Sequence, residues 1–350
     1  MEERSDDVPL QPPAPTTIGI SYNLKKGVSS DIPDIEAEYD NIDTVYAIRD
    51  ALEAVGFKTL LLEADETLPE KLKNSRVDMV FNIAEGSYGR GREAQVPALL
   101  NFFGIPFTGS DETTLCLALD KALTKRLLAA YRVRTPKYRV LDGHSAAGAD
   151  GLRFPVIIKP NTEGSSKGIS DISIAEDKKQ FKALVSRTAE LYRGTVLAEE
   201  YIGGREFTVG LLGNGFDVRV FAPMEIIFKR DTQKNYRVYD YGVKQDYKNY
   251  IDYRCPAELT QAAEREMKQT ALRIFNALGC RDCARVDFRM ADDGLIYFIE
   301  INPLPGLAPG YSDYPMLAEF SGISYGELIV GILRAAAIRC GLALRPEAEA

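Results

Sequence analysis

The chain has 350 residues, of which 45% are hydrophobic and 27% are charged, with a formal net charge of −8. This composition is typical of a soluble globular protein, and the length predicts two or three subdomains. The negative charge argues against nucleic acid as a partner, and no apolar run is long enough to span a membrane. Residues 1–15 are acidic, rich in proline and without an apolar core, which predicts a disordered leader rather than a secretory signal.

The first part of the chain alternates strands and helices. Residues 16–22, 58–64 and 77–84 have the composition of buried strands, and residues 42–55 have apolar positions at helical spacing. This alternation predicts a parallel α/β sheet within a substrate-binding subdomain of residues 16–115. Ligands bind at the carboxyl ends of such strands, so the Gly- and Arg-rich loop after residue 84 is a candidate site.

Two α+β regions are predicted to follow. A helical pattern covers residues 113–131, and the central subdomain, residues 116–205, adds three strands and a helix. Their ranges are 154–160, 169–174, 195–202 and, for the helix, 176–192. The last subdomain, residues 206–345, is predicted to contain four strands and a long helix. Their ranges are 207–213, 217–228, 284–290, 295–303 and, for the helix, 258–278. Residues 229–254 are polar, rich in tyrosine and without a clear period, which predicts a mobile loop.

Cysteine and histidine usage excludes several chemistries. The five cysteines favour reduced thiols in a cytoplasmic protein, and the Cys280-x-x-Cys283 pair is better explained by burial than by zinc. His144 is the only histidine and lies in a Gly/Ala-rich loop, which argues against a Ser-His-Asp or Cys-His enzyme. Any catalysis must therefore use carboxylates, lysines, arginines, backbone amides and a hard metal ion.

One candidate site is the segment 159–168, KPNTEGSSKG. A strand of buried character ends at Lys159, and a loop of small residues follows. Backbone N–H groups in such a loop bind phosphate oxygens, while the lysine supplies positive charge. A plain Gly/Ser turn is an equally good interpretation of this segment alone.

A second candidate site combines Asp287 with Glu300 and Asn302. Glu300 and Asn302 are two residues apart on a predicted strand, so they share a face, and Asp287 lies on the preceding strand of a predicted hairpin. Three oxygen ligands on adjacent strands suit Mg²⁺ bound to nucleotide phosphates. The alternative is a set of hydrogen-bonded or exposed acids.

A third candidate site is the strand end at residues 197–202, LAEEYI, with Glu206 shortly after it. An acidic pair followed by an aromatic and an aliphatic residue suits the edge of an adenine and a ribose. Acidic residues at strand ends are common, so this pattern alone is not specific.

Together, these motifs resemble the ATP-grasp superfamily, and within it the D-alanine–D-alanine ligases. The resemblance covers residues 16–340, and its most specific pieces are PVIIKPNTEGSSKGI, LAEEYIGGREFTVGLL, ARVDF and FIEINPLPGL. It implies an ATP-grasp fold with the three subdomains above, the cofactors ATP and Mg²⁺ (with Mn²⁺ as an alternative ion), and a cytoplasmic homodimer in peptidoglycan biosynthesis. The implied activity is ATP-dependent joining of a carboxylate to an amine through an acyl phosphate.

The resemblance also implies a role for each matching residue. The residues implied to bind nucleotide and metal are Lys121 and Lys159 for phosphates, Glu199 with the backbone near Tyr201 and Ile202 for adenine, Glu206 for ribose, and Asp287, Glu300 and Asn302 for magnesium. The residues implied to act on the reacting groups are Ser165 for phosphate and substrate, Lys244 for phosphate on loop closure, and Arg285 with the Gly306 backbone for the tetrahedral intermediate.

The sequence departs from the family where the substrate would bind. Glu38, or Asp40 almost equally well, is the acid available for a substrate ammonium. The other departures are Glu85, Arg92 and Glu93 in the loop after residue 84, Gln245 after Lys244, and Asp313 after Ser312. Bidentate binding of a substrate carboxylate is one hypothesis for Arg92, and contact with a cationic or hydroxyl group is one for Asp313.

These departures keep three functions open. The leading one is a D-alanine–D-alanine ligase-like enzyme with D-alanine as one candidate substrate. The second is a ligase of the same mechanism acting on other amino acids or on a small biosynthetic intermediate. The third is an ATP-binding protein without catalysis. The evidence against it is that Lys159, Arg285, Asp287, Glu300 and Asn302 are all intact.

Overall fold

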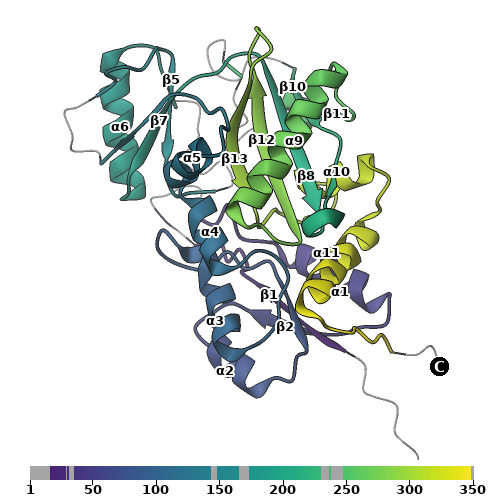
Figure 1. Cartoon of the computed structure of the whole chain (residues 1–350). Helices are drawn as coiled ribbons and strands as arrows, with labels where there is room; N and C mark the ends of the chain where they lie inside the picture. Colours follow the sequence, from purple (N-terminus) through teal and green to yellow (C-terminus); the bar gives the residue numbers. More distant parts are fainter. Residues whose placement is uncertain are drawn as a thin grey trace, which may run out of the picture.

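The structure is a computed structural model that describes residues 16–28, 30, 35–142, 148–164, 173–229, 236–237 and 247–347. Its strands form three sheets of three, four and six strands. In Figure 1 the small sheet lies at the bottom, the four-stranded sheet at the upper left and the six-stranded sheet at the upper right. The predicted α/β (α+β) class is therefore confirmed.

The N-terminal sheet is parallel, as the alternation of strands and helices predicts. Its strand order is β2-β1-β3, and its strands are β1 (Thr17–Tyr22), β2 (Lys58–Glu63) and β3 (Met79–Asn82). The helices of this part are α1 (Ile42–Glu53), α2 (Leu68–Asn74) and α3 (Gln95–Phe103), with the short 3-10 helix η1 (Arg92–Ala94) before α3. The loop between β3 and η1 therefore begins at the carboxyl edge of this sheet.

The single helix predicted for residues 113–131 is wrong, because the chain breaks at Asp120. The break separates α4 (Glu112–Leu119) from α5 (Lys121–Ala129). Asp120 has extended backbone angles, and its carboxylate accepts a hydrogen bond from the Leu123 amide at 3.0 Å. A short acidic side chain stabilises the start of a helix better than its middle, which explains the break.

The central sheet is antiparallel and has the strand order β4-β7-β5-β6. Its strands are β4 (Tyr138–Leu141), β5 (Val156–Pro160), β6 (Ile174–Ala175) and β7 (Val196–Glu200). Helix α6 (Lys178–Tyr192) begins at Asp177, whose side chain accepts from two backbone amides, and its buried residues belong to the same core as the sheet. This unit presents β5 and β7 toward the C-terminal sheet.

The C-terminal sheet has the order β11-β10-β8-β12-β13, with β9 paired to β8. Its strands are β8 (Arg205–Leu212), β9 (Arg219–Val220), β10 (Met224–Phe228), β11 (Ile251–Arg254), β12 (Cys283–Met290) and β13 (Ile296–Asn302). The strand predicted for residues 217–228 is therefore two strands. Pro223 lies between them, and proline cannot donate a hydrogen bond to a sheet.

The last part of the segment predicted as a mobile loop, residues 229–254, has regular structure. It forms α8 (Tyr247–Tyr250) and then β11, which pairs with β10 along Ile251–Arg254. Tyrosine and isoleucine favour strands, but the polar residues between them hide the alternation that would have predicted β11. Residues 230–235 and 238–246 lie outside the described residues.

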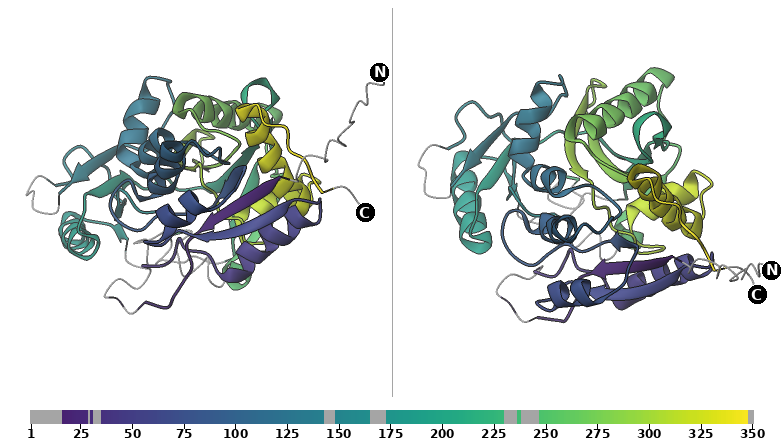
Figure 2. Two further views of the ribbon diagram at one scale, coloured as in Figure 1. Left: turned by 90° about the horizontal axis from the view of Figure 1, so that it is seen from below. Right: turned by 60° about the horizontal axis from the view of Figure 1, so that its bottom comes forward.

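Two large hydrophobic cores lie in the described part of the molecule. One lies between α9 (Gln261–Leu278) and the C-terminal sheet. The other joins β1 and α1 to α10 (Asp313–Phe320) and α11 (Tyr325–Cys340), far along the chain. Figure 2 shows the yellow C-terminal helices beside the purple N-terminal elements.

None of the helices in the described ranges is by itself long and apolar enough to cross a membrane. The pair α10 and α11, bent by 103°, passes that test of length and composition only when taken together. Several apolar residues of both helices are buried in the second core.

Asp282 connects three parts of the molecule through its fully buried carboxylate. It pairs with Arg339 of α11 at 2.7 Å and accepts hydrogen bonds from the Gly109 amide at 2.8 Å and from Asn214 at 2.7 Å. Removing one partner of such a pair leaves a charge without compensation, so we expect Asp282→Ala to lower the free energy of unfolding by about 3–5 kcal/mol.

Urea denaturation of Asp282→Ala measures this cost, with Asp217→Ala as the control. Asp217 is exposed on the 3-10 helix η2 (Gly215–Asp217), so its loss is expected to change stability little. Equal effects of the two substitutions would contradict the role given to Asp282.

Candidate functional site

The hairpin of β12 and β13 brings four polar side chains to one place. In its register Arg285 is opposite Asn302, and Asp287 is opposite Glu300. Residues opposite each other in an antiparallel pair share a face, as do residues two apart on one strand. The predicted proximity of Asp287, Glu300 and Asn302 is thus confirmed.

Arg285 is buried among carboxylates. Its guanidinium donates to Asp287 at 3.0 and 2.9 Å and lies 3.3 Å from Asp313. Burial disfavours a charge, but the carboxylates of Asp287 and Asp313 outweigh it and raise the pKa of Arg285. The side chain is therefore a permanent cation held at the edge of both pockets described below.

The oxygen donors of Asp287, Glu300 and Asn302 fit a hard divalent ion. Asp287 and Glu300 offer carboxylate oxygens, and Asn302, which donates to Asp287 at 3.3 Å, keeps its amide oxygen as a further donor. Within the described residues no group of three or more His, Cys, Asp or Glu forms a metal site by itself. An ion held here would therefore depend on oxygens from bound phosphates as well.

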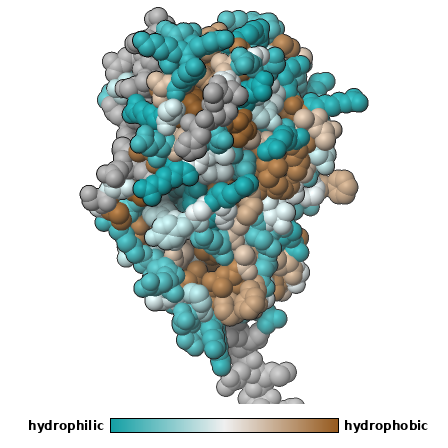
Figure 3. All heavy atoms as spheres, turned by 90° about the vertical axis from the view of Figure 1, so that its left-hand side faces the viewer, coloured by the Kyte–Doolittle hydropathy of each residue, from teal (hydrophilic) through white to brown (hydrophobic). Residues whose placement is uncertain are grey.

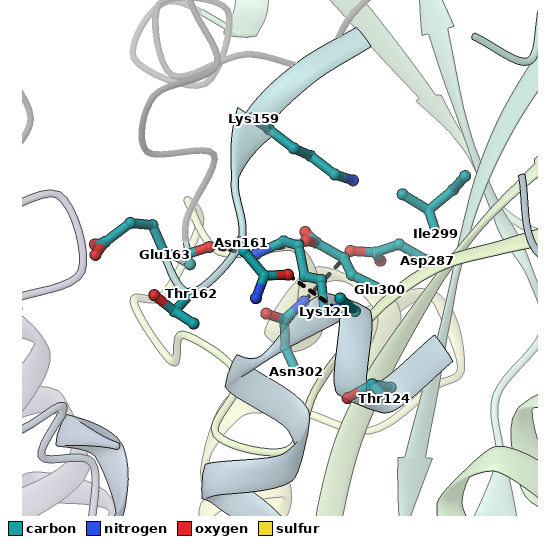
Figure 4. Close-up of polar contacts among 12 residues, drawn as sticks. Lys121, Thr124, Lys159, Asn161, Thr162, Glu163, Asp287, Ile299, Glu300 and Asn302 are labelled. Atoms are coloured by element: carbon teal, nitrogen blue, oxygen red, sulfur yellow. Dashed lines mark hydrogen bonds and ion pairs between the residues drawn. The ribbon is translucent and has the colours of Figure 1, made fainter. Parts of the chain in front are cut away.

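Two lysines converge on this trio. Lys121, the first residue of α5, donates to the backbone oxygen of Glu163 and lies 3.7 Å from Glu300. Lys159, on β5, extends toward the same space from the central sheet, and Figure 4 shows both lysines with Asp287, Glu300 and Asn302. The structure thus brings together the two lysines expected to contact phosphate.

Glu199 lies between Lys159, at 2.6 Å, and Lys125, at 2.9 Å, and all three are buried. Burial disfavours the charge of Lys159, but the carboxylates of Glu199 and Glu300 outweigh burial and raise the pKa of Lys159. At Lys125 burial dominates and lowers the pKa to about 8. The Glu199 carboxylate, expected at adenine, is thus engaged by lysines. Lys125 was not predicted, although its position four residues after Lys121 places both on one side of α5.

A pocket with apolar walls lies beside Lys159 and Glu199, and we call it the nucleotide pocket. Residues that line it come from both sheets. They include Ile157, Lys159, Glu199, Tyr201, Ile202, Glu206, Phe207, Ile226, Arg285, Asp287, Arg289, Ile299, Glu300 and Asp313. Arg289 lies over the Tyr201 ring at 4.9 Å and 3.5 Å from Glu206. The lining of the pocket therefore combines apolar and aromatic side chains with charged ones.

A second pocket lies next to the first at Glu300. We call it the donor pocket, because the sequence predicts that the carboxylate substrate, which donates the acyl group, binds there. Residues that line it come from the N-terminal, central and C-terminal parts of the chain. They include Glu38, Asp40, Glu85, Glu93, Lys121, Gly164, Arg285, Glu300, Asn302 and Gly306. Arg285 and Glu300 line both pockets. A molecule in the donor pocket can thus meet one in the nucleotide pocket.

Arg92 is engaged within the chain. Its guanidinium donates to Glu38, with one bond of 3.0 Å, and to the Thr162 backbone oxygen at 2.9 Å, and it lies 3.3 Å from Glu163. These contacts occupy the guanidinium that the sequence suggested for a substrate carboxylate, and they fix the position of Glu38. Glu38 also accepts from the Gly164 amide at 2.6 Å.

Gly306 lines the donor pocket, whereas Asp313 lines the nucleotide pocket. A Cβ at Gly306 would lie 2.9 Å from the Ser312 hydroxyl, so only glycine fits there without a shift. Asp313 is buried and accepts from the Tyr253 hydroxyl at 2.9 Å besides pairing with Arg285. The cationic and hydroxyl partners suggested for Asp313 in a substrate are therefore present in the chain itself.

Some predicted site residues lie outside the described residues. They are Ser165, Lys244 and Gln245, and His144, which is not a predicted site residue, also lies outside them. Their expected roles stay predictions. Cys280 and Cys283 are both buried, and burial raises the pKa of both thiols, that of Cys280 to about 12. This agrees with the structural role predicted for the pair.

Asp40 predicts a pH dependence of stability. Burial raises its pKa from 3.8 to about 7, so the contribution of Asp40 to the stability of the folded state is fully present below pH 4 and is lost as the pH rises through 7. We expect Asp40→Asn to gain about 2 kcal/mol or more relative to the natural protein between pH 5 and pH 8.

Urea denaturation at the two pH values checks this, with Asp43→Asn as the control. Asp43 is exposed in the first turn of α1. A difference between Asp40→Asn and the natural protein that is the same at both pH values would contradict it.

Comparison with known proteins agrees with this geometry. The family model "D-ala D-ala ligase C-terminus" matches residues 133–334. The D-alanine–D-alanine ligase of Bordetella petrii is 33% identical over 83% of this chain and 86% of its own length, and that of Cupriavidus metallidurans is 35% identical over 75% and 76%. The crystal structure of D-alanine–D-alanine ligase from Bacillus anthracis with ATP has a TM-score of 0.72 at 23% identity, over 93% of this chain and 98% of that one. This likeness shows the fold.

Proposed function

Because the chain belongs to the D-alanine–D-alanine ligase family, we propose that it is an ATP-dependent ligase that joins a carboxylate to an amine. The observation that carries the proposal is that the nucleotide pocket and the donor pocket share Arg285 and Glu300. A phosphate held at Lys121 and Lys159 would lie beside a carboxylate held in the donor pocket. This is the geometry that phosphorylation of a carboxylate requires.

Within this proposal the described residues have distinct roles. Ile202 and the Tyr201 ring would contact the adenine, Glu206 the ribose, and Lys121 and Lys159 the phosphates. Lysines stabilise the charge that spreads over a transferring phosphoryl group. Asp287, Glu300 and Asn302 would hold Mg²⁺, which would supply further neutralisation of phosphate charge.

The second half of the reaction would depend on Arg285 and the Gly306 backbone. Attack of an amine on the acyl phosphate forms a tetrahedral oxyanion, and fixed donors near that oxygen lower the barrier. Arg285 is a permanent cation in a buried position, so little reorganisation is needed when charge develops. Ser165 and Lys244 are proposed to assist from the segments outside the described residues.

The substrate is the open part of the proposal. D-alanine is the substrate that the names of the relatives give for those proteins. Ligation of other amino acids by the same mechanism is favoured by the acids of the donor pocket, namely Glu85 and Glu93. We also propose a cytoplasmic homodimer, which light scattering after size-exclusion chromatography tests.

Phosphate release from Mg-ATP with single and paired D- and L-amino acids, followed by mass spectrometry of products, tests the function. D-alanyl-D-alanine as the product would identify an enzyme of peptidoglycan biosynthesis. A different amide would confirm the mechanism with another substrate. Tight ATP binding without amino-acid-dependent turnover would contradict the ligase proposal and support a protein that only binds ATP.

A further inference from the structure

The donor pocket contains more carboxylates than the chain compensates. Glu38, Asp40, Glu85 and Glu93 line its N-terminal side, and the cations that line it are Lys121 and Arg285. Arg285 pairs with Asp287 and Asp313, and Lys121 lies closest to Glu300 and the Glu163 backbone. Arg92 acts on Glu85 and Glu93, and Lys121 on Glu93, only at longer range, because neither cation forms an ion pair with these two acids in the described ranges.

Glu38 is the acid that the chain itself satisfies. Both of its oxygens accept hydrogen bonds from Arg92, and one also accepts from the Gly164 amide. A carboxylate fixed in this way has a defined position and keeps its negative charge toward the pocket that it lines. It is suited to one ammonium group.

Glu85 and Glu93 differ from Glu38 in their partners. Neither carboxylate accepts a hydrogen bond or forms an ion pair with any residue of the described ranges, and both line the donor pocket. Glu93 lies in the 3-10 helix η1 and is only 8% exposed. Glu85 is the third residue after the end of β3 at Asn82. Each is close enough to Glu38 and to the other for mutual repulsion.

A buried carboxylate without a partner is costly unless a proton or a cation joins it. Burial and the neighbouring acids raise the pKa of Glu93 to about 7 and that of Glu85 well above its ordinary value. A ligand cation would remove this cost, because an ammonium group offers three donors and a compensating charge. The pocket thus favours a ligand with more positive charge than one α-ammonium group carries.

Building on the ligase function proposed above, we infer that the carboxylate substrate in the donor pocket is a diamino acid, whose second ammonium group is held by Glu85 and Glu93. Its carboxylate lies toward Arg285 and Gly306, where it can be phosphorylated, and its α-ammonium group is at Glu38. The second ammonium group does not react. Its role is to select this substrate over amino acids with uncharged side chains.

Pairs of amino acids with the same shape test this inference. They are 2,4-diaminobutyrate against norvaline and ornithine against norleucine, each as both enantiomers, because each pair differs by an ammonium group in place of a methyl group. Binding is measured by calorimetry with Mg²⁺ and a non-hydrolysable ATP analogue, and turnover by phosphate release from Mg-ATP. We expect one enantiomer of a diamino acid to bind about 10- to 100-fold more tightly than the uncharged amino acid of the same shape and configuration. This is the range for a hydrogen bond to a charged group.

Variants connect the preference to the two acids. Glu93→Gln and Glu85→Gln keep the size of the side chain, and we expect each to reduce the preference about tenfold or more while norvaline and norleucine are affected little. Glu70→Gln is the matched control, because Glu70 is exposed on α2 and does not line the donor pocket. It is expected to retain the full preference.

The outcomes separate this inference from the ligase function. Turnover or binding without a preference for the diamino acid, or a preference that both glutamine variants keep, would overturn the inference and leave the ligase function intact. A preference in binding that the variants lose, with no phosphate release and no product, would support the inference about the pocket and overturn the ligase function. No binding of any of the four amino acids would overturn the inference.

Discussion

Arg285→Met is expected to lower kcat by about 10²–10³-fold while KM for the substrates changes little. The guanidinium lies at the boundary of the nucleotide and donor pockets and is fixed by Asp287 and Asp313. A donor that acts on the developing oxyanion stabilises the transition state more than the bound substrate, so its loss appears in kcat. Steady-state kinetics with the substrate pair found by the amino-acid panel measure both constants.

The same substitution also leaves Asp287 and Asp313 without their cation, which is costly in a buried site. Thermal denaturation and active-site titration therefore accompany the kinetics, and kcat is expressed per folded site. Arg219→Met is the control, because Arg219 is exposed on β9 of the same sheet and contacts the Ser321 backbone oxygen. A loss of activity that vanishes after correction for unfolded protein would assign Arg285 a structural role only.

Glu300→Gln is expected to lower kcat/KM on the order of 10³-fold, because it replaces a charged metal ligand beside the phosphate site with a neutral one. Glutamine keeps the shape of the side chain, and the ion pair of Glu300 with Lys121 is long at 3.7 Å, so the fold should be retained. The concentration of Mg²⁺ needed for half-maximal activity should rise as well. A titration of phosphate release against Mg²⁺ measures both effects.

The control for this experiment is Glu319→Gln, at an exposed position of α10. An unchanged Mg²⁺ requirement in Glu300→Gln, together with reduced turnover, would indicate that Glu300 acts on Lys121 rather than on the metal. Unchanged turnover would remove Glu300 from the catalytic site.

The parts predicted well from the sequence depend on local patterns. Alternating strands and helices predicted the parallel sheet, and the two-residue spacing of Glu300 and Asn302 placed both on one face, with Asp287 on the neighbouring strand. The strand pattern could be predicted because a strand has a period of two residues whatever packs against it. The helix break at Asp120 was missed because helical spacing of apolar residues continues through it, and only the capping side chain ends the helix.

The contacts that could not be predicted join distant parts of the chain. Arg92 and Glu38 are 54 positions apart, and nothing local to either indicates that they pair. The buried ion pairs of Glu199 with Lys125 and Lys159 are likewise formed between different elements. Their residue types were visible in the sequence, but which cation meets which acid depends on the packing of three units.

Figure 3 shows a face of the molecule that is largely hydrophilic, with hydrophobic side chains in separate groups. Most large apolar residues are instead enclosed within the cores. This distribution agrees with a protein whose recognition of ligands takes place in pockets between its sheets.

The core around the first helix is completed by the last one. Ile48 and Leu52 of α1 pack in the same core as Ile329 and Leu333 of α11, nearly the whole chain later. During synthesis on the ribosome, domains fold as soon as their own contacts are available, and exposed apolar surface attracts chaperones or causes aggregation. The core of the N-terminal sheet therefore remains incomplete, with apolar residues uncovered, until α11 has emerged. A chain truncated before α11 is expected to bind chaperones.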